Sequence, residues 1–498
     1  MRPLEIASLS LIGLALLLFL APAARRPAWA RWVPAAAAAF LGLQLAVEGH
    51  RWQLDLAYPV CAGLLVASWL GRRTRWHHAI VVVLAALGGL GLLASVLLAA
   101  GSPMFELPRP TGRHAIGVTN LYVADPAREE IFSDDPNDHR ELMVRIWYPA
   151  AGVPDSQEPA PYWDDVEQAG PLMAQLSREA LGINVRDNAF DHYADIPTHS
   201  YADAPLAAEP RLLPVLVFSH GYGVARPSSN TALMEELASR GYWVASIAHT
   251  YESPAVVFED GRVVSWDAEA VAGLLSNEDG SFFESFVQTE DPAQRDDLVR
   301  SFLAEQTHTS RSMKVWNADT HTVVDEIERI ASGERATPFA GRLALDRLAV
   351  LGMSFGGAAA GVFCVEDPRC KAGLNLDGFH YGDGMADAVV RVPFMILSAK
   401  RGEIPINEFF FRHAAGPAYI AVIDGSTHMN FTDTSISSRI LRWLGALGDI
   451  DGQRMLRIMN VYVSAFLDQH LLGKKSPLLE GDSADYPEVE LLSRNTGA

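Results

Sequence analysis

The feature that most constrains the fold is the segment 348–361, LAVLGMSFGGAAAG. A short apolar run ends at Ser354, which Gly352 and Gly356 flank, and a series of Gly and Ala residues follows. This pattern predicts a buried strand, a sharp turn and a helix that packs tightly on a sheet. The glycines are needed because side chains there would collide with neighbouring strands and with the turn itself. The segment therefore predicts a turn that presents the Ser354 hydroxyl.

The chain around this segment alternates between strand and helix patterns from about residue 106 onward. The expected strands are 142–150, 214–223, 241–249, 348–354, 372–378, 393–399 and 418–425. The expected helices are 230–240, 313–332 and 454–472. Buried strands separated by helices predict a mostly parallel sheet that is covered on both faces, an α/β fold. We expect the Pro- and Asp-rich residues 155–210 to wrap the surface, and residues 252–311 to form a lid or substrate-binding insertion.

The first hundred residues have a different character, with four uncharged apolar runs. These runs are Ile6–Ala24, Trp32–Val47, Leu56–Gly71 and Ala79–Met104. The first and last are long enough to cross about 30 Å of hydrocarbon, and the middle two are slightly short. We therefore expect a membrane domain with four transmembrane helices at 1–104 and a catalytic domain at 105–498.

The arginines between the apolar runs predict the orientation. The first linker carries Arg25, Arg26 and Arg31, and the third carries Arg72, Arg73 and Arg75. Because positively charged loops stay in the cytoplasm, the N-terminus and the catalytic domain are both expected outside. The alternative is that the first run is a cleaved signal peptide, which would leave the body in the cytoplasm against this rule. We expect a multi-pass protein of the cell membrane, and the Ala, Arg and Leu content indicates a bacterial genome.

Charge and cysteine usage narrow the class of partner. The chain beyond residue 101 holds 57 acidic and 32 basic residues, which argues against a nucleic-acid partner.

Cys364 and Cys370 are six positions apart, so a disulfide is plausible in an oxidising compartment and free thiols are the alternative. A metal site is disfavoured because no CxxC motif or nearby histidine accompanies them.

A nucleophilic serine needs a base, and the base needs a residue that orients it. Asp377 ends one expected strand and His428 follows another, in the chain order serine, acid, histidine that is typical of this fold. Both lie at carboxyl ends of strands, where sites gather in open α/β sheets. Structural readings remain for both, a helix cap for Asp377 and a loop histidine for His428.

An ester-cleaving serine also needs two N–H groups that receive the oxyanion. One is expected from Phe355, directly after the serine. The other is expected from Tyr222 in SHGYG (219–223), because this loop follows the strand PVLVF. A plain turn built on Gly221 and Gly223 is compatible with that role.

At these residues the chain resembles the plasma-type platelet-activating factor acetylhydrolases, also called lipoprotein-associated phospholipase A2. The similar pieces are PVLVFSHGYGVARPSSNTALMEELASRGYWVASIAHTYES, LAVLGMSFGGAAA, LNLDGF and GSTHMNF, within roughly 210–435. The resemblance implies an α/β-hydrolase fold, a Ser354–His428–Asp377 triad, and oxyanion N–H groups from Tyr222 and Phe355. It also implies cleavage of short or oxidised acyl groups from phospholipids without calcium or another cofactor. Met353 departs from the histidine that this family often has before the nucleophile.

Other functions share these motifs. A general esterase, or a dienelactone- or polyester-cleaving hydrolase, would use the same residues on another ester. An acyltransferase and a peptidase would share the same acyl-enzyme chemistry. A non-catalytic binding module is disfavoured because all three triad residue types are present. The sequence leaves the oligomeric state open.

Overall fold

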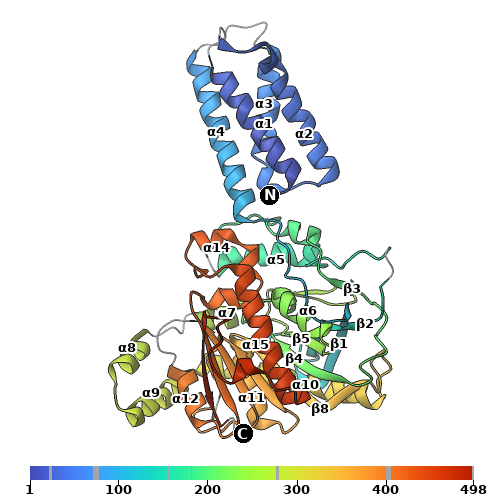
Figure 1. Ribbon diagram of the computed structural model, residues 1–498, viewed down its shortest axis with the longest axis vertical. Coiled ribbons are helices and arrows are strands. Elements are labelled where there is room, and N and C mark those ends of the chain that lie inside the picture. The colour runs from blue at the N-terminus through green and yellow to red at the C-terminus, as the bar shows by residue number, and fades with distance from the viewer. Residues whose placement is uncertain are drawn as a thin grey trace. The chain divides into compact units, whose positions relative to one another are not determined.

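The computed structural model describes residues 1–21, 25–70, 78–153, 156–180, 182–275, 280–380, 382, 384–399 and 405–495. Two compact units make up the chain (Figure 1). The first is Met1–Phe105 with Ser437–Trp443, and the second is Glu106–Ile436 with Leu444–Ala498. Each unit is described separately below.

The first unit is built from apolar helices. They are α1 (Pro3–Leu20), α2 (Val33–Val47), α3 (Ala57–Leu70) and α4 (His78–Gly101), with the short α14 (Arg439–Trp443) in the same unit. Within the described residues, three segments are long and apolar enough to cross a membrane, namely Pro3–Leu20, Ala28–Val47 and Val82–Gly101. The prediction of four spans is therefore supported for three, because α3 has only 14 residues. Arg72, Arg73 and Arg75, which support the expected orientation, lie outside the described residues.

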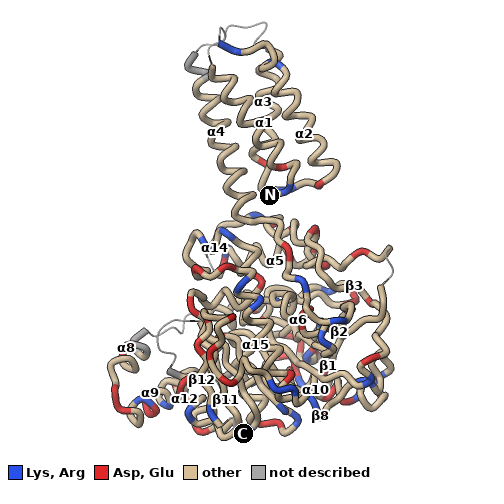
Figure 2. The backbone as a smooth tube through the Cα atoms, viewed as in Figure 1, with Lys and Arg blue, Asp and Glu red and all other residues tan. Residues whose placement is uncertain are grey.

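One ion pair is buried in this unit. The Arg51 guanidinium donates to the Glu5 carboxylate at 2.9 Å, and both side chains are fully buried. Arg51 also donates to the carbonyl of Ser102 at 2.6 Å, so it ties the start of α1 to the end of α4. Figure 2 shows that charged residues are otherwise sparse along α1 to α4 and frequent over the second unit.

The second unit contains a ten-stranded sheet. Its order is β12-β11-β10-β9-β8-β4-β5-β2-β1-β3, and the six strands from β11 to β5 are parallel. The strands are β1 (Ala115–Glu129), β2 (His139–Ala150), β3 (Ser200–Ala202), β4 (Leu213–Ser219), β5 (Trp243–Ala248), β8 (Leu343–Met353), β9 (Ala372–Leu376), β10 (Phe394–Ala399), β11 (Ala418–Ile423) and β12 (Val489–Arg494). The mostly parallel α/β sheet expected from the sequence is confirmed.

Helices cover this sheet in two packed pairs. One pair is α6 (Thr231–Ser239) with α15 (Gly452–Leu472), and the other is α10 (Thr307–Ser332) with α11 (Phe355–Glu366). The central strands are buried because both of their faces are covered, which explains their continuous apolar sequences.

Five described strands, β1, β3, β6, β7 and β12, and several helices were not expected from the sequence. Residues 155–210, expected as surface-wrapping chain, include α5 (Val166–Glu179), which the Gly170-Pro171 pair made difficult to recognise. In its described residues the insertion 252–311 contains a two-stranded hairpin, three helices and the start of α10. Its elements are β6 (Ala255–Val257), β7 (Val263–Ser265), α7 (Ala268–Leu275), α8 (Gly280–Gln288) and α9 (Pro292–Glu305).

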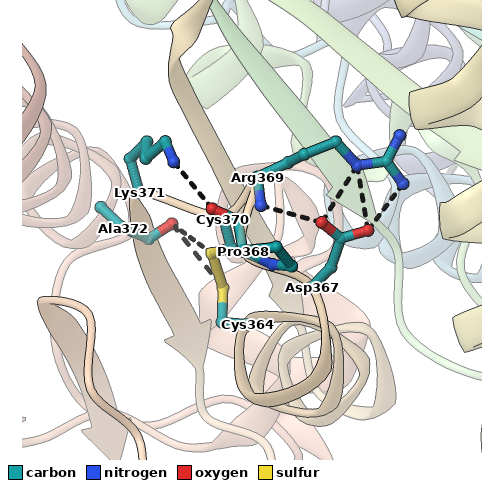
Figure 3. Close-up of a disulfide and its surroundings, with 7 residues drawn as sticks. All are labelled: Cys364, Asp367, Pro368, Arg369, Cys370, Lys371 and Ala372. Carbon is teal, nitrogen blue, oxygen red and sulfur yellow. Dashed lines mark hydrogen bonds and ion pairs between the residues drawn. A yellow bond between two sulfur atoms is a disulfide. The ribbon is translucent and has the colours of Figure 1, made fainter.

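A disulfide joins Cys364 near the end of α11 to Cys370 just before β9, with Cα atoms 5.1 Å apart (Figure 3). Between the two cysteines, Asp367 accepts hydrogen bonds from the Arg369 guanidinium, the shortest at 2.6 Å. Lys371 donates to the carbonyl of Pro368 at 2.7 Å. The bridge closes a short loop between the helix that follows Ser354 and the strand that leads to Asp377.

Candidate active site

Ser354 occupies a strained turn between β8 and α11. Its backbone is in the left-handed region, with φ 56° and ψ −121°, which a non-glycine residue rarely adopts. The flanking glycines allow this turn. A Cβ on Gly356 would lie 2.0 Å from the Ser219 carbonyl oxygen, and one on Gly352 would lie 2.3 Å from the backbone of Gly356. The half-buried hydroxyl therefore stands at the carboxyl edge of the sheet, as the sequence pattern predicts.

The three residues expected to form a triad lie in hydrogen-bond contact. His428 Nε2 is 2.9 Å from Ser354 Oγ, and His428 Nδ1 is 2.7 Å from Asp377 Oδ2. Asp377 comes directly after β9, and His428 begins a short helical turn after β11. These distances suit proton transfer between the hydroxyl and the imidazole.

Asp377 is held rigidly behind the histidine. Its Oδ1 accepts the N–H of Ala399 at 2.8 Å and the hydroxyl of Ser398 at 3.3 Å, both at the end of β10. The carboxylate is nearly buried, whereas 35% of the His428 side chain is exposed. Two donors on one oxygen leave the other oxygen directed at His428, so the imidazole is fixed in one orientation.

Tyr222 and Phe355, the two residues expected to supply oxyanion N–H groups, belong to segments that adjoin Ser354. A Cβ on Gly221 would be 3.5 Å from the Ser354 Cβ, so the loop before Tyr222 passes directly against the serine. In the part of the chain that the structure describes, neither the Tyr222 N–H nor the Phe355 N–H has a hydrogen-bond partner. Two free N–H groups beside a nucleophile can receive a developing negative charge. The two side chains also touch, with ring centroids 5.1 Å apart in an edge-to-face arrangement.

A buried polar cluster lies behind this loop, and no local sequence pattern predicts it. Glu252 contacts Tyr222 and the indole of Trp316 on α10. Burial raises the pKa of Glu252 to about 7. Local sequence patterns could not identify Glu252, because its contacts with Tyr222 and Trp316 join segments that are 30 and 64 positions apart in the chain.

Two other histidines near strand ends, His249 and His380, are buried and packed against neighbouring side chains. His249 is fully buried between Ser219 and Asp319. His380 is buried against the ring of Phe410, with centroids 3.8 Å apart, and burial lowers its pKa to about 3. Neither lies in the hydrogen-bond chain of Ser354.

The insertion forms a small apolar core with α12 (Pro405–His413). Phe282 of α8 stacks on Phe302 of α9 with ring centroids 4.0 Å apart, and Phe409 of α12 belongs to the same cluster. Phe379, two positions after Asp377, packs against it. The insertion is thus attached beside the strand end that carries Asp377, while residues 276–279 of the expected lid lie outside the described residues.

In the described part of the chain, no group of three or more His, Cys, Asp or Glu side chains is arranged to hold a metal ion. The described site is built from hydroxyl, imidazole, carboxylate and backbone N–H groups.

Comparison with known proteins decides the family. The family model for platelet-activating factor acetylhydrolase, isoform II, matches residues 99–484. The chain belongs to this family. Residues 1–98, which include most of the apolar helices, lie outside the match.

Individual relatives agree with this assignment. Platelet-activating factor acetylhydrolase of Gallus gallus is 25% identical over 390 residues, which cover 74% of this chain and 85% of the relative. A probable 1-alkyl-2-acetylglycerophosphocholine esterase of Arthroderma benhamiae is 24% identical over 443 residues, covering 80% and 97%.

A solved structure points the same way. The ferulic acid esterase from Streptomyces cinnamoneus matches with a TM-score of 0.57 and 28% identity, covering 78% of this chain and 100% of that one. The fold is that of an α/β-hydrolase, and the chain is a serine ester hydrolase of the platelet-activating factor acetylhydrolase type.

Proposed function

We propose that Ser354, His428 and Asp377 are the catalytic triad of this hydrolase, with the oxyanion received by the N–H groups of Tyr222 and Phe355. The observation that carries the proposal is the continuous hydrogen-bonded chain from Ser354 Oγ through His428 to Asp377, which starts at a strained backbone position. Strained backbone conformations of this kind cluster at functional sites.

The proposed reaction runs through an acyl-enzyme. Ser354 Oγ attacks the ester carbonyl while His428 Nε2 takes the hydroxyl proton, and the carbonyl oxygen becomes the oxyanion. His428 then gives this proton to the departing alcohol, and the carbonyl re-forms on an acyl-serine. A water molecule, deprotonated by His428, attacks the acyl-serine and releases the carboxylic acid. Asp377 keeps the imidazole in the required tautomer and stabilises its charged form.

The proposed substrate is a phospholipid with a short or oxidised acyl group. Two relatives are named for acetylated alkyl phospholipids, and the apolar N-terminal helices would keep the enzyme near lipid. We further propose that α3 crosses the membrane as a fourth span, that the Glu106–Ala498 part is extracytoplasmic, and that the Cys364–Cys370 bridge forms there.

A second candidate is a general esterase that acts on soluble aryl or alkyl esters. The structural neighbour, a ferulic acid esterase, favours this candidate. Both candidates use the same triad, so they differ in the group that the substrate pocket accepts.

The test is a substrate series on the full-length protein in detergent micelles with EDTA present. We would measure hydrolysis of p-nitrophenyl esters from acetate to palmitate, of methyl ferulate, and of a phosphatidylcholine with an sn-2 acetyl group. The proposal expects activity that falls with acyl length, a higher kcat/KM on the acetyl phospholipid than on methyl ferulate, and complete loss in Ser354→Ala. Preference for methyl ferulate would instead support the general esterase. Release of acyl groups to added short alcohols faster than to water would indicate an acyltransferase.

A further inference from the structure

Glu252 carries a buried carboxylate directly behind the proposed oxyanion loop. Its Oε1 accepts the hydroxyl of Tyr222 at 2.8 Å, and its Oε2 accepts the indole N–H of Trp316 at 2.9 Å. The residue has no exposed surface. In the described part of the chain no Arg, Lys or His forms an ion pair with it, so these neutral donors satisfy the carboxylate. A buried carboxylate without a cationic partner is costly and needs a reason to be there.

Trp316 links this carboxylate to both proposed oxyanion residues. Its ring stacks on Tyr222 at 5.7 Å and meets Phe355 edge-to-face at 5.0 Å. Its indole also stacks on His249, at 3.7 Å and 10°. The indole is fully buried, so it has no free space in which to reorient. Fixing its N–H therefore fixes the side chains of Tyr222 and Phe355, whose backbone N–H groups are the proposed oxyanion donors.

The backbone adds a second link to the same loop. The N–H of Gly223, directly after Tyr222, donates to the carbonyl of Glu252 at 3.2 Å, and the N–H of Glu252 donates to the carbonyl of His249 at 3.0 Å. Side chain and main chain of one residue thus hold the segment on which the Tyr222 N–H lies.

We propose that Glu252 is a positioning residue for ester hydrolysis, which orients the Tyr222 and Phe355 N–H groups by holding the Tyr222 hydroxyl and the Trp316 indole. This inference rests on the proposed oxyanion role of those two N–H groups. Glu252 does not contact the reacting atoms, so its effect passes through Tyr222 and Trp316.

The position of this residue gives the proposal a further consequence. Glu252 is the first residue of the insertion 252–311, and Ser312, one residue beyond its end, lies 3.2 Å from the Tyr222 hydroxyl. Both ends of the insertion therefore meet at the proposed oxyanion residue. A displacement of the insertion would be felt at the oxyanion N–H groups through these two contacts.

Protonation of Glu252 would disturb the arrangement. Burial raises the pKa of Glu252 to about 7, so both ionisation states are accessible near neutral pH. The charged form accepts from its neighbours, whereas the neutral acid must donate a proton of its own and forces one partner to turn. The titratable and charged groups around it come from five elements. They are Tyr222 after β4, His249 after β5, Arg140 on β2, Asp319 on α10, and Asp267 before α7.

The experiment compares Glu252→Gln, Tyr222→Phe and the double variant, with Glu326→Gln as the matched control. Glu326 is also a buried glutamate, but it lies further along α10 and pairs with Arg329 and Arg335. For each full-length variant we would measure kcat and KM on p-nitrophenyl acetate from pH 5 to 9, together with the melting temperature.

We expect Glu252→Gln to lower kcat by about tenfold to a hundredfold with KM nearly unchanged, which is less than deleting an oxyanion donor costs. Tyr222→Phe, which removes only the hydroxyl, should give a similar decrease, and the double variant should be no slower than the slower single variant. The pH profile of Glu252→Gln should lose an ionisation near 7 that the wild type and Glu326→Gln retain.

Three results would overturn the proposal: wild-type kcat and pH profile in Glu252→Gln, additive losses in the double variant, or a lower melting temperature with unchanged kcat. If Glu252→Gln fails to fold, Tyr222→Phe alone tests the proposal. A wild-type kcat in Tyr222→Phe would show that the hydrogen bond between the Tyr222 hydroxyl and Glu252 does not affect catalysis, and would overturn the proposal. Activity remaining in Ser354→Ala would instead contradict the proposed function, independently of these variants.

Discussion

The second unit contains two hydrogen-bonded Ser–His–Asp chains, which share residue types and distances but differ in their surroundings. In the first, His428 lies 2.9 Å from Ser354 Oγ and 2.7 Å from Asp377. In the second, His249 lies 3.0 Å from Ser219 Oγ and 2.8 Å from Asp319. The residue types and distances alone would not tell an active site from a structural cluster.

The surroundings distinguish the two. Ser219, His249 and Asp319 are almost completely buried, and Asp319 also accepts from the Arg140 guanidinium at 2.7 Å. Ser219 lies within β4, whereas Ser354 occupies a left-handed turn beside two free N–H groups. Access, backbone strain and neighbouring free N–H groups therefore distinguish the proposed active site from the buried structural cluster, and the following experiments test that distinction.

Removal of the two serine hydroxyls should have the most unequal effects. We expect Ser354→Ala to lower kcat by about a million-fold with little change in melting temperature, because it deletes the nucleophile. Ser219→Ala should keep kcat within about threefold, since it only removes one buried hydrogen bond. Steady-state hydrolysis of p-nitrophenyl acetate, with melting curves for both variants, checks this. Equal losses of kcat would erase the distinction between the two chains.

The two aspartates should separate activity from stability. Asp377→Asn should lower kcat by about ten-thousand-fold, because an amide cannot hold His428 in the required tautomer. Asp424→Asn is the matched control, since Asp424 directly follows β11 four positions before His428, whereas the two ring nitrogens of His428 contact Asp377 and Ser354. Kinetics on purified variants provide the measurement, and a control as slow as Asp377→Asn would contradict the assignment.

Asp319→Asn should act mainly on folding. It leaves the buried Arg140 without one of its carboxylate partners, which typically costs about 3–5 kcal/mol of unfolding free energy. Urea titration followed by fluorescence measures this loss, and Asp125→Asn, a partly exposed carboxylate near the same α10 helix, is the control. An unchanged free energy of unfolding in Asp319→Asn would show that the buried Ser219–His249–Asp319 hydrogen bonds do not stabilise the fold.

The buried histidine should also leave a signature in the pH dependence of stability. Burial lowers the pKa of His249 in the folded state, so the unfolded state binds more protons at this group as the pH falls below about 6.5. Because the unfolded state then binds more protons, stability decreases as the pH is lowered below 6.5, by at most about 1.4 kcal/mol per pH unit for this group.

His249→Asn, which retains a donor for Asp319, should be less stable than the wild type at pH 8 and should show a shallower decrease between pH 6.5 and 5. Urea titrations at four pH values measure both slopes. Parallel slopes would mean that His249 does not contribute to the acid sensitivity.

The sequence predicted what depends on local pattern. The G-x-S-x-G turn, the buried strands and the strand-end positions of Asp377 and His428 could all be read from neighbouring residues, and the structure brings these side chains together. The two free N–H groups at Tyr222 and Phe355 followed from the same logic.

What the sequence could not predict depends on pairing across the fold. Trp316 and Glu252 meet only because α10 packs behind the loop after β4, and Asp319 was not recognised as the partner of His249. β1 contains Gly117 and, near its end, Asp-Pro-Ala-Arg (125–128), which resembles loop sequence, and its strand state depends on pairing with β2. Tertiary contact therefore decided these elements, and single-sequence propensity did not.

The close packing of Gly352 and Gly356 against the backbone around Ser219 has a consequence for engineering this enzyme. A library randomised across the serine turn would consist mostly of inactive members, because any side chain at either glycine must displace main chain. Diversity is better placed between residues 255 and 305 of the insertion, away from Glu252 and Ser312, where the hairpin and helices lie outside the sheet. We therefore expect new substrate ranges to arise from changes in the surrounding loops, while the serine turn itself tolerates almost no variation.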